Sequence, residues 1–117
     1  MSAPGVVHLG LGAFHRAHQA LVFGALQDAH GPSWSVLAFS MRDPTVARQL
    51  AANQYRYHLR MGDASGAHWR VCHGISQTGV AALEPQRVVQ AMAAATCRWV
   101  TPTVTEKGYT SDLAELL

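Results

Sequence analysis

Residues 6–18 decide the fold class, and they read Val6-Val7-His8-Leu9-Gly10-Leu11-Gly12-Ala13-Phe14-His15-Arg16-Ala17-His18. The first four form a short run rich in β-branched residues, which predicts a buried strand over residues 6–9. Gly10 and Gly12 then end the strand in a tight turn, because glycine tolerates backbone conformations that other residues avoid. Apolar residues recur at helical spacing from His15 to Asp28, so we expect a helix after the turn.

A strand, a glycine-containing turn and a helix in this order can bind a dinucleotide. Gly10 permits the tight turn, and Gly12 removes a Cβ where a pyrophosphate must approach the backbone. The phosphates would lie against the free N–H groups and the positive dipole end of the helix. The usual third glycine would fall at position 15, which is His15 in this chain. Spacing alone therefore leaves an ordinary strand-to-helix turn as an equal alternative.

Strand and helix patterns alternate along the rest of the chain. We expect a strand over residues 34–40, a short helix from Asp43-Pro44 to about Asn53, a helix over 84–96, and a strand over 98–101 that Pro102 interrupts or ends. Residues 55–61 and 68–76 alternate in polarity around a turn at 62–66, which predicts a β-hairpin. The fold class is therefore α/β and Rossmann-like, with a mainly parallel sheet and one β-hairpin insertion. Right-handed crossovers would place the last strand beside the first, and we expect the sheet to be incomplete because a doubly wound fold needs further strands.

Length, composition and charge narrow the functional classes. With 117 residues, 49% of them hydrophobic and 14% charged, the chain is expected to be one globular domain. Its formal net charge is +2, and its basic residues are dispersed, which argues against a nucleic-acid partner. The longest apolar run, residues 20–26, is too short to cross a membrane. The first residues carry no positive charge of the kind found in secretory signals, so we expect the cytoplasm.

A longer set of motifs resembles one enzyme family. Residues 10–20 resemble the N-terminal signature of the mannitol dehydrogenase family, the long-chain polyol and sugar-acid dehydrogenases that include fructuronate reductase. Segments 39–42, 55–59 and 103–109 match in the same order, so the resemblance covers nearly the whole chain up to Tyr109. It implies that residues 1–117 are a truncated N-terminal, NAD(P)-binding Rossmann-type domain. The complete enzyme would interconvert a small-molecule polyol or sugar acid with its keto form by hydride transfer.

The resemblance also implies that part of the enzyme is missing from this chain. Family members are several times longer, and their catalytic lysine belongs to a later Lys-x-x-x-x-Asn-x-x-His helix. That pattern does not occur here, and we do not assign its role to Lys107, the only lysine. We therefore predict no catalytic residue and expect the isolated chain to be inactive. A non-catalytic nucleotide-binding or interaction module, associating through an exposed sheet edge, and a fragment without stable function remain alternatives.

The residues expected to bind NAD or NADP are Gly10, Gly12, Ala13, Phe14, Arg42, Asp43, Thr105 and Glu106. The resemblance places the backbone N–H of Phe14 near the cofactor diphosphate. It also places Thr105 and Glu106 near the nicotinamide end of the crevice. We predict no metal site, because His15 and His18 lack a third ligand.

Arg42 and Asp43 bear on the choice between the two cofactors. Arg42 could accommodate the 2′-phosphate of NADP. Asp43 follows Gly12 by 31 residues, whereas the acidic residue that holds the adenosine ribose usually follows the glycines by about 20. This spacing fits the ribose role poorly, whereas local sequence independently supports a role for Asp43 as the cap of the helix that Pro44 opens. The sequence therefore leaves NAD and NADP as open alternatives.

Overall fold

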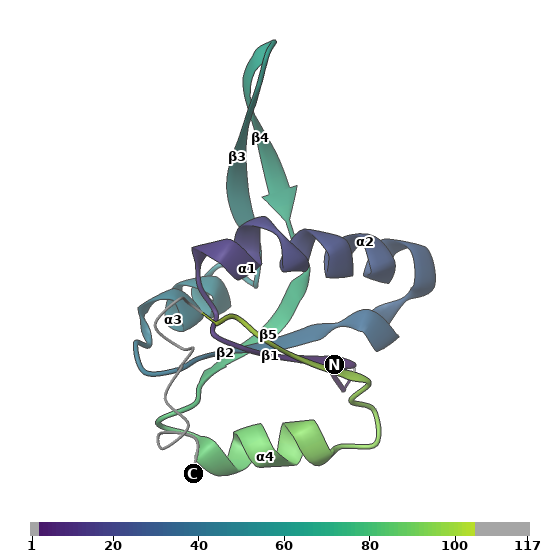
Figure 1. Cartoon of the computed structure of the whole chain (residues 1–117), viewed down its shortest axis with the longest axis vertical. Helices are drawn as coiled ribbons and strands as arrows, with labels where there is room; N and C mark the ends of the chain where they lie inside the picture. The colour runs from purple at the N-terminus through teal and green to yellow at the C-terminus, as the bar shows by residue number, and fades with distance from the viewer. Residues whose placement is uncertain (1–2, 105–117) are drawn as a thin grey trace, which may run out of the picture.

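A computed structural model describes residues 3–104 and shows a central sheet of four parallel strands (Figure 1). These strands are β1 (Val6–Leu9), β2 (Val36–Ser40), β5 (Ile75–Val80) and β6 (Trp99–Pro102), and they lie in the order β5-β2-β1-β6. Counted along the chain, this is the order 3-2-1-4 with which a doubly wound dinucleotide fold begins. The α/β, Rossmann-like class and the mainly parallel sheet are confirmed. The predicted placement of the last strand beside the first is confirmed as well.

Helices cover both faces of this sheet (Figure 1). One face carries α1 (Ala13–Ala17), α2 (Gln19–His30) and α3 (Thr45–Ala52), and the other carries α4 (Pro85–Ala93). A short 3₁₀ turn, η1 (Pro32–Trp34), connects α2 to β2. Successive strand side chains point to opposite faces, so Val6 packs toward α2 and α3 while Val7 packs toward α4. Between residues 3 and 104 no helix is long and apolar enough to cross a membrane.

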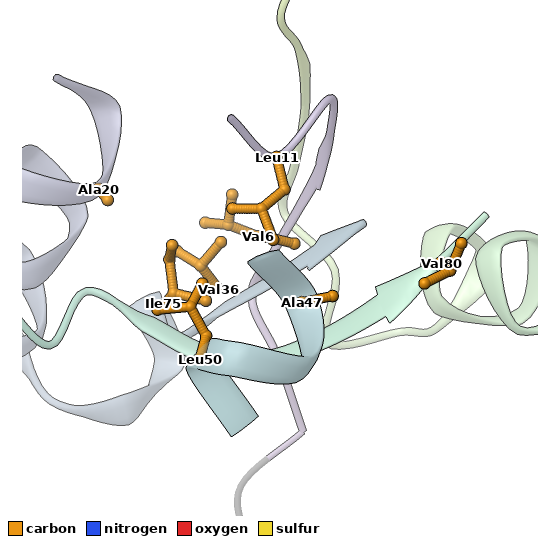
Figure 2. Close-up of a cluster of buried hydrophobic side chains, with 9 residues drawn as sticks. Val6, Leu11, Ala20, Val36, Ala47, Leu50, Ile75 and Val80 are labelled. Atoms are coloured by element: carbon orange, nitrogen blue, oxygen red, sulfur yellow. The ribbon is translucent and has the colours of Figure 1, made fainter. Parts of the chain in front are cut away.

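The larger core cluster lies between the sheet and α2 and α3 (Figure 2). Its members are Val6, Leu11, Ala20, Val36, Ala38, Ala47, Leu50, Ile75 and Val80. Leu11 belongs to the turn after β1, yet it packs in this core and is only 7% exposed. A fully buried leucine stabilises a fold by about 1.5–3 kcal/mol. Burial of Leu11 therefore anchors the turn to the core.

Helix α2 lies unusually close to the segment that leads into β5. A Cβ atom on Gly74 would overlap the carbonyl oxygen of Ala20, so only glycine fits there without a shift. The side-chain amide of Gln27 donates a hydrogen bond to Gly74 O at 2.8 Å. The side chains of His73 and Asp28 lie within hydrogen-bond distance beside it, with 2.9 Å between Nε2 and Oδ1. These contacts hold α2 against the segment that leads into β5.

The β-hairpin insertion is confirmed, but one of its predicted strands is wrong in extent. The hairpin consists of β3 (Tyr57–Asp63) and β4 (Gly66–Cys72), which pair antiparallel and project beyond the helices (Figure 1). The strand predicted over 68–76 combines the end of β4 with the start of β5. The chain turns at His73 and Gly74 and re-enters the main sheet as a parallel strand.

Other boundaries differ from the prediction as well: β2 begins at Val36 rather than residue 34, and α4 ends at Ala93 rather than residue 96. The helix expected from His15 to Asp28 is divided at His18, whose φ of −127° and ψ of −79° are not helical. The short helix after Asp43 begins one residue later than expected, at Thr45. Strand β6 ends at Pro102, as its missing N–H group requires.

Candidate functional site

Gly10 gives the turn between β1 and α1 its backbone conformation. Its φ of +102° lies in the region that favours glycine. A Cβ atom at this position would also lie 3.1 Å from the carbonyl oxygen of Thr103. The N–H groups of Gly10 and Leu11 both donate to Phe39 O at 2.9 Å, so β2 already occupies these two donors. Glycine at position 10 is therefore required by the fold itself.

Gly12 differs from Gly10, because the chain's own packing does not require a glycine there. Its φ of −155° and ψ of −169° are extended values that any residue adopts. Within the described residues, a Cβ atom on Gly12 would meet one atom within 4 Å, the carbonyl oxygen of Gly10 at 3.9 Å. The space that the missing side chain would fill is thus open. Such space allows another molecule to approach the backbone closely.

Backbone donors are available next to this space. In the described part of the chain, the N–H groups of Gly12, Ala13 and Phe14 have no hydrogen-bond acceptor, because a first helical turn cannot supply one. The guanidinium Nε of Arg16 donates a hydrogen bond to Gly12 O at 3.2 Å, which connects the α1 side chain to the turn. The Phe14 side chain is 59% exposed, and its ring lies against that of His18 at a centroid distance of 4.5 Å. The arrangement suits an anionic ligand that accepts hydrogen bonds from the main chain.

An open hollow of about 560 Å³ extends from the turn to the end of β2. The residues that line it are Gly10, Leu11, Gly12, Ala13, Phe14, Ser40, Met41, Arg42, Asp43, Val46 and Thr103. They belong to the segments that follow the carboxyl ends of β1, β2 and β6. In open α/β sheets this edge is where ligands bind.

Asp43 has a structural role at one end of this hollow. Its Oδ1 accepts hydrogen bonds from Thr45 N at 2.9 Å and from Thr45 Oγ1 at 2.7 Å. These two bonds hold the pKa of the Asp43 carboxyl below its usual range. Asp43 therefore accepts hydrogen bonds from the first residue of α3, as a capping role expects, and Pro44 between them has helical φ and ψ angles of −80° and −6°. Ser40 Oγ donates to Asp43 O at 2.7 Å and ties the same loop to β2.

Arg42 has a different environment from Asp43. Its side chain is exposed and makes no hydrogen bond to any residue between 3 and 104. The guanidinium is therefore available to a ligand at this end of the hollow.

A pair of buried histidines lies under the turn. The rings of His8 and His15 stack with centroids 3.6 Å apart and planes 13° apart, and both residues are 0% exposed. Burial and the neighbouring His8 lower the pKa of His15 to about 4, although a hydrogen bond to Gln19 offsets part of the effect. Burial likewise lowers the pKa of His8, against an opposing effect of its bond to Gly10 O. Both imidazoles are therefore neutral near pH 7.

Six of the eight residues predicted to bind the cofactor line the same hollow. Thr105 and Glu106 lie outside the described residues. Sequence reasoning missed three residues whose side chains form hydrogen bonds beside the turn: His8 on β1, Thr101 on β6, and Thr103, which directly follows β6. The available signal was a histidine inside an otherwise apolar strand. Between residues 3 and 104, no three His, Cys, Asp or Glu side chains lie close enough together to hold a metal ion.

Comparisons with known proteins agree with this geometry. The family described as "Mannitol dehydrogenase Rossmann domain" matches residues 4–117. D-mannonate oxidoreductase of Escherichia coli (strain K12) is 32% identical, over 93% of this chain and 23% of that protein. Mannitol 2-dehydrogenase of Cereibacter sphaeroides is 35% identical, over 93% of this chain and 24% of that protein.

Solved structures give the same answer. The mannitol 2-dehydrogenase of Pseudomonas fluorescens, in a ternary complex with NAD and D-mannitol, superposes with a TM-score of 0.82 at 34% identity. The match covers 92% of this chain and 23% of that one. A D-sorbitol dehydrogenase in substrate-free form superposes with a TM-score of 0.80 at 30% identity. The chain spans about a quarter of the length of these relatives. It belongs to the mannitol dehydrogenase family, and it corresponds to the Rossmann domain of that family.

Proposed function

We propose that residues 1–117 are the N-terminal dinucleotide-binding domain, truncated, of an NAD(P)-dependent oxidoreductase. The enzyme interconverts a polyol or a sugar acid with its keto form. The observation that carries the proposal is Gly12, a glycine that neither backbone conformation nor packing demands. Its missing side chain leaves space against free N–H groups, which fits the diphosphate of a dinucleotide.

The diphosphate would bind at residues 12–14. The N–H groups of Gly12, Ala13 and Phe14 would donate to its oxygens, while Gly10 and Leu11 remain bonded to Phe39. Burial of Leu11 on the core side keeps the main chain exposed on the ligand side. Gly10 would therefore shape the turn, whereas Gly12 would contact the diphosphate.

The adenosine end would lie near Arg42 and Asp43, and both NAD and NADP remain candidates. One Asp43 oxygen is occupied by Thr45, which leaves Oδ2 to accept a hydrogen bond from a ribose hydroxyl. The exposed guanidinium of Arg42 could instead pair with a 2′-phosphate. Asp43 would therefore favour NAD, whereas Arg42 would favour NADP.

The nicotinamide end would lie toward Thr105 and Glu106, which follow β6 in the sequence. A bound nicotinamide cofactor supplies or accepts the hydride in such enzymes, and the protein supplies position and electrostatics. The Lys-x-x-x-x-Asn-x-x-His pattern is absent from the 117 residues. We therefore infer that the isolated chain binds a dinucleotide without turning over polyol or sugar acid. We place the protein in the cytoplasm, without a nucleic-acid or membrane partner.

A fluorescence titration with NADH and NADPH tests the proposal. The wild-type chain should bind at least one of them saturably. Gly12→Val should abolish binding, because its side chain would enter the hollow. Gly62→Val is the matched control, since Gly62 lies on the hairpin and a Cβ atom there would have no other atom within 4 Å. Failure of the wild-type chain to bind either nucleotide, or binding equally strong in Gly12→Val, would contradict the proposal.

One observation favours the interaction module as a second candidate. In the described sheet, β6 pairs only with β1, so its outer edge has no strand beside it. Trp99 on this strand is 54% exposed. Unpaired edges with exposed apolar side chains favour association. Sedimentation of the purified chain would test this candidate, because association through β6 predicts oligomers that Trp99→Lys disrupts.

A further inference from the structure

Strand β5 forms one edge of the central sheet in the part of the chain that the structure describes, with β2 on its inner side. In a parallel strand each residue turns its N–H and C=O groups to the same side, and consecutive residues alternate. The N–H of Ala81 donates to Ser40 O at the end of β2, so Ala81 faces inward. Thr78 and Val80 therefore turn their main-chain groups outward, where a further strand would pair.

Two side chains from the start of α4 occupy these outward groups. The carboxylate Oε2 of Glu84 accepts a hydrogen bond from Val80 N at 3.0 Å. The guanidinium Nη1 of Arg87 donates to Thr78 O at 3.1 Å. The N–H groups of Leu83 and Glu84 both donate to Val80 O, so the turn after β5 uses that carbonyl as well. Among residues 3–104, the Thr78 N–H is then the one of these four outward groups without a partner.

The carboxylate and the guanidinium reproduce the hydrogen bonds of one residue in a neighbouring strand. Such a residue, placed opposite Gly79 in a parallel pair, would donate its N–H to Thr78 O and accept from Val80 N–H with its C=O. Arg87 supplies the donor and Glu84 supplies the acceptor. The two side chains are also joined to each other, with 3.2 Å between Nη1 and Oε1. Together they fill one position of a strand that is not there.

Gly79 and Phe39 explain why this pair can lie so close to β5. A Cβ atom on Gly79 would lie 2.7 Å from Arg87 Nη1 and 2.8 Å from Glu84 Oε2, so the glycine leaves the space that the two side chains use. The guanidinium carbon of Arg87 lies 5.5 Å from the ring centroid of Phe39 on β2, which is within the range of a cation–π interaction. The pair is therefore packed against the sheet.

The helices on either face leave this edge open. An open groove of about 340 Å³ runs along it, lined by residues of α3 and β5 and by Leu83, Glu84 and Arg87. Unpaired edges of sheets invite pairing with another chain. The two charged side chains are therefore what stands between the main chain of β5 and an incoming strand.

We propose that Glu84 and Arg87 form an edge cap, which takes the place of one residue of a neighbouring strand and prevents β5 from pairing with a second copy of this chain. The inference is independent of the proposed function, because it concerns neither the hollow nor a nucleotide. The side chains of Arg87 and Glu84 are 37% and 39% exposed, and ion pairs with that exposure contribute little to stability. Loss of the edge cap should therefore change association more than folding.

Amide exchange with water, measured by NMR on the ¹⁵N-labelled 117-residue chain at a low and a high protein concentration, tests the proposal. In wild type, exchange at Thr78 should be the same at both concentrations. In Glu84→Ala/Arg87→Ala, exchange at Val80 should be tenfold or more faster at low concentration, because its acceptor is gone. Exchange at Thr78 should slow tenfold or more at high concentration, because a second copy now bonds this N–H. Ala81 remains bonded to Ser40 and should stay within about threefold of wild type, which separates loss of the edge cap from general unfolding.

Two control variants sharpen the comparison. Glu84→Gln keeps an amide oxygen that can accept from Val80 N–H, so Val80 should exchange within about threefold of wild type. Gln86→Ala/Gln90→Ala changes two exposed side chains of the same helix and should behave as wild type at both concentrations. If Glu84→Ala/Arg87→Ala does not fold, as judged by circular dichroism, Glu84→Asp/Arg87→Ala decides in its place. Aspartate suits the position before α4 but is one methylene too short to reach Val80 N–H.

Three results would overturn the proposal. Exchange at Thr78 that slows with concentration in wild type would show that β5 pairs despite the two side chains. Exchange at Thr78 that is independent of concentration in the variant without the edge cap would show that the pair does not close this edge. Equal exchange at Val80 in wild type and that variant would show that Glu84 does not protect the outward N–H.

Discussion

The imidazole of His8 lies flat against that of His15, with ring centroids 3.6 Å apart. Strand β1 supplies one ring and helix α1 the other, on either side of the turn at Gly10. Burial keeps both rings neutral. A buried polar contact therefore lies behind the turn, whereas the hollow itself is lined by other residues, among them Phe14, Met41 and Arg42.

Folding stability should depend on pH through His15. The unfolded chain takes up a proton at this residue below about pH 6.5, whereas the folded chain does so only near pH 4. The free energy of unfolding should therefore fall as pH decreases from 6.5 to 4 and level off for this group below 4. Each pH unit corresponds to about 1.4 kcal/mol, so His15 accounts for at most about 3 kcal/mol.

Urea unfolding at several pH values measures this dependence. His15→Gln should remove a large part of the slope between pH 4.5 and 6.5, whereas His58→Gln should leave the slope as in wild type, because His58 is exposed. Identical slopes in wild type and His15→Gln would show that His15 is not held neutral by folding.

Gly10→Ala should mainly lower folding stability, whereas Gly12→Ala should mainly weaken nucleotide binding. Alanine at position 10 meets an unfavourable φ and a close contact with Thr103 O, so it should lower the free energy of unfolding by about 1–3 kcal/mol. Alanine at position 12 should change it by less than about 1 kcal/mol and weaken NADH binding by tenfold or more. Urea unfolding and NADH fluorescence measure the two effects separately. Equal NADH affinity in Gly12→Ala and wild type would contradict the expected approach of the diphosphate.

Arg42 and Asp43 should shift cofactor preference in opposite directions. Arg42→Gln should weaken NADPH binding about tenfold relative to NADH, because it removes a charge-assisted bond to the 2′-phosphate. Asp43→Asn should strengthen NADPH binding relative to NADH, since it removes a negative charge while its amide oxygen still accepts from Thr45. Parallel titrations with the two nucleotides give the ratios. Unchanged ratios in both variants would place the adenosine ribose elsewhere.

Gly74→Ala should destabilise the fold, because its Cβ would overlap Ala20 O where α2 crosses the sheet. We expect a loss of about 2 kcal/mol or more in the free energy of unfolding. Gly62→Ala provides the comparison, since no atom lies within 4 Å of its Cβ position, and it should change stability by less than about 1 kcal/mol. Thermal unfolding of both variants checks the expectation, and a stability of Gly74→Ala equal to that of Gly62→Ala would disprove the close approach.

Local signals in the sequence were sufficient to predict the first strand, its glycine turn and the class of the fold. Val6 and Val7 are β-branched, and Gly10 has the positive φ that only glycine adopts easily. Pro102 ends its strand because it lacks an N–H group. Each of these features depends on residues close to one another in sequence, which is why single-sequence reasoning succeeds for them.

Features that depend on tertiary contacts were missed. Strand β5 contains Ser76, Gln77 and Thr78, and neither helical nor alternating apolar spacing identifies it. Its polar groups are satisfied by helices, as when Thr78 Oγ1 donates to Ala47 O at 2.9 Å. The role of His8 was also missed, since its partner Thr101 lies 93 residues away.

Amide chemical shifts of the ¹⁵N-labelled chain, recorded as NAD is added, test the central claim most directly. The account predicts that the largest changes occur at Gly12, Ala13 and Phe14, whose N–H groups are free, and extend to Arg42 and Asp43 across the hollow. Changes confined to the hairpin at residues 57–72, or no changes at saturating NAD, would contradict it.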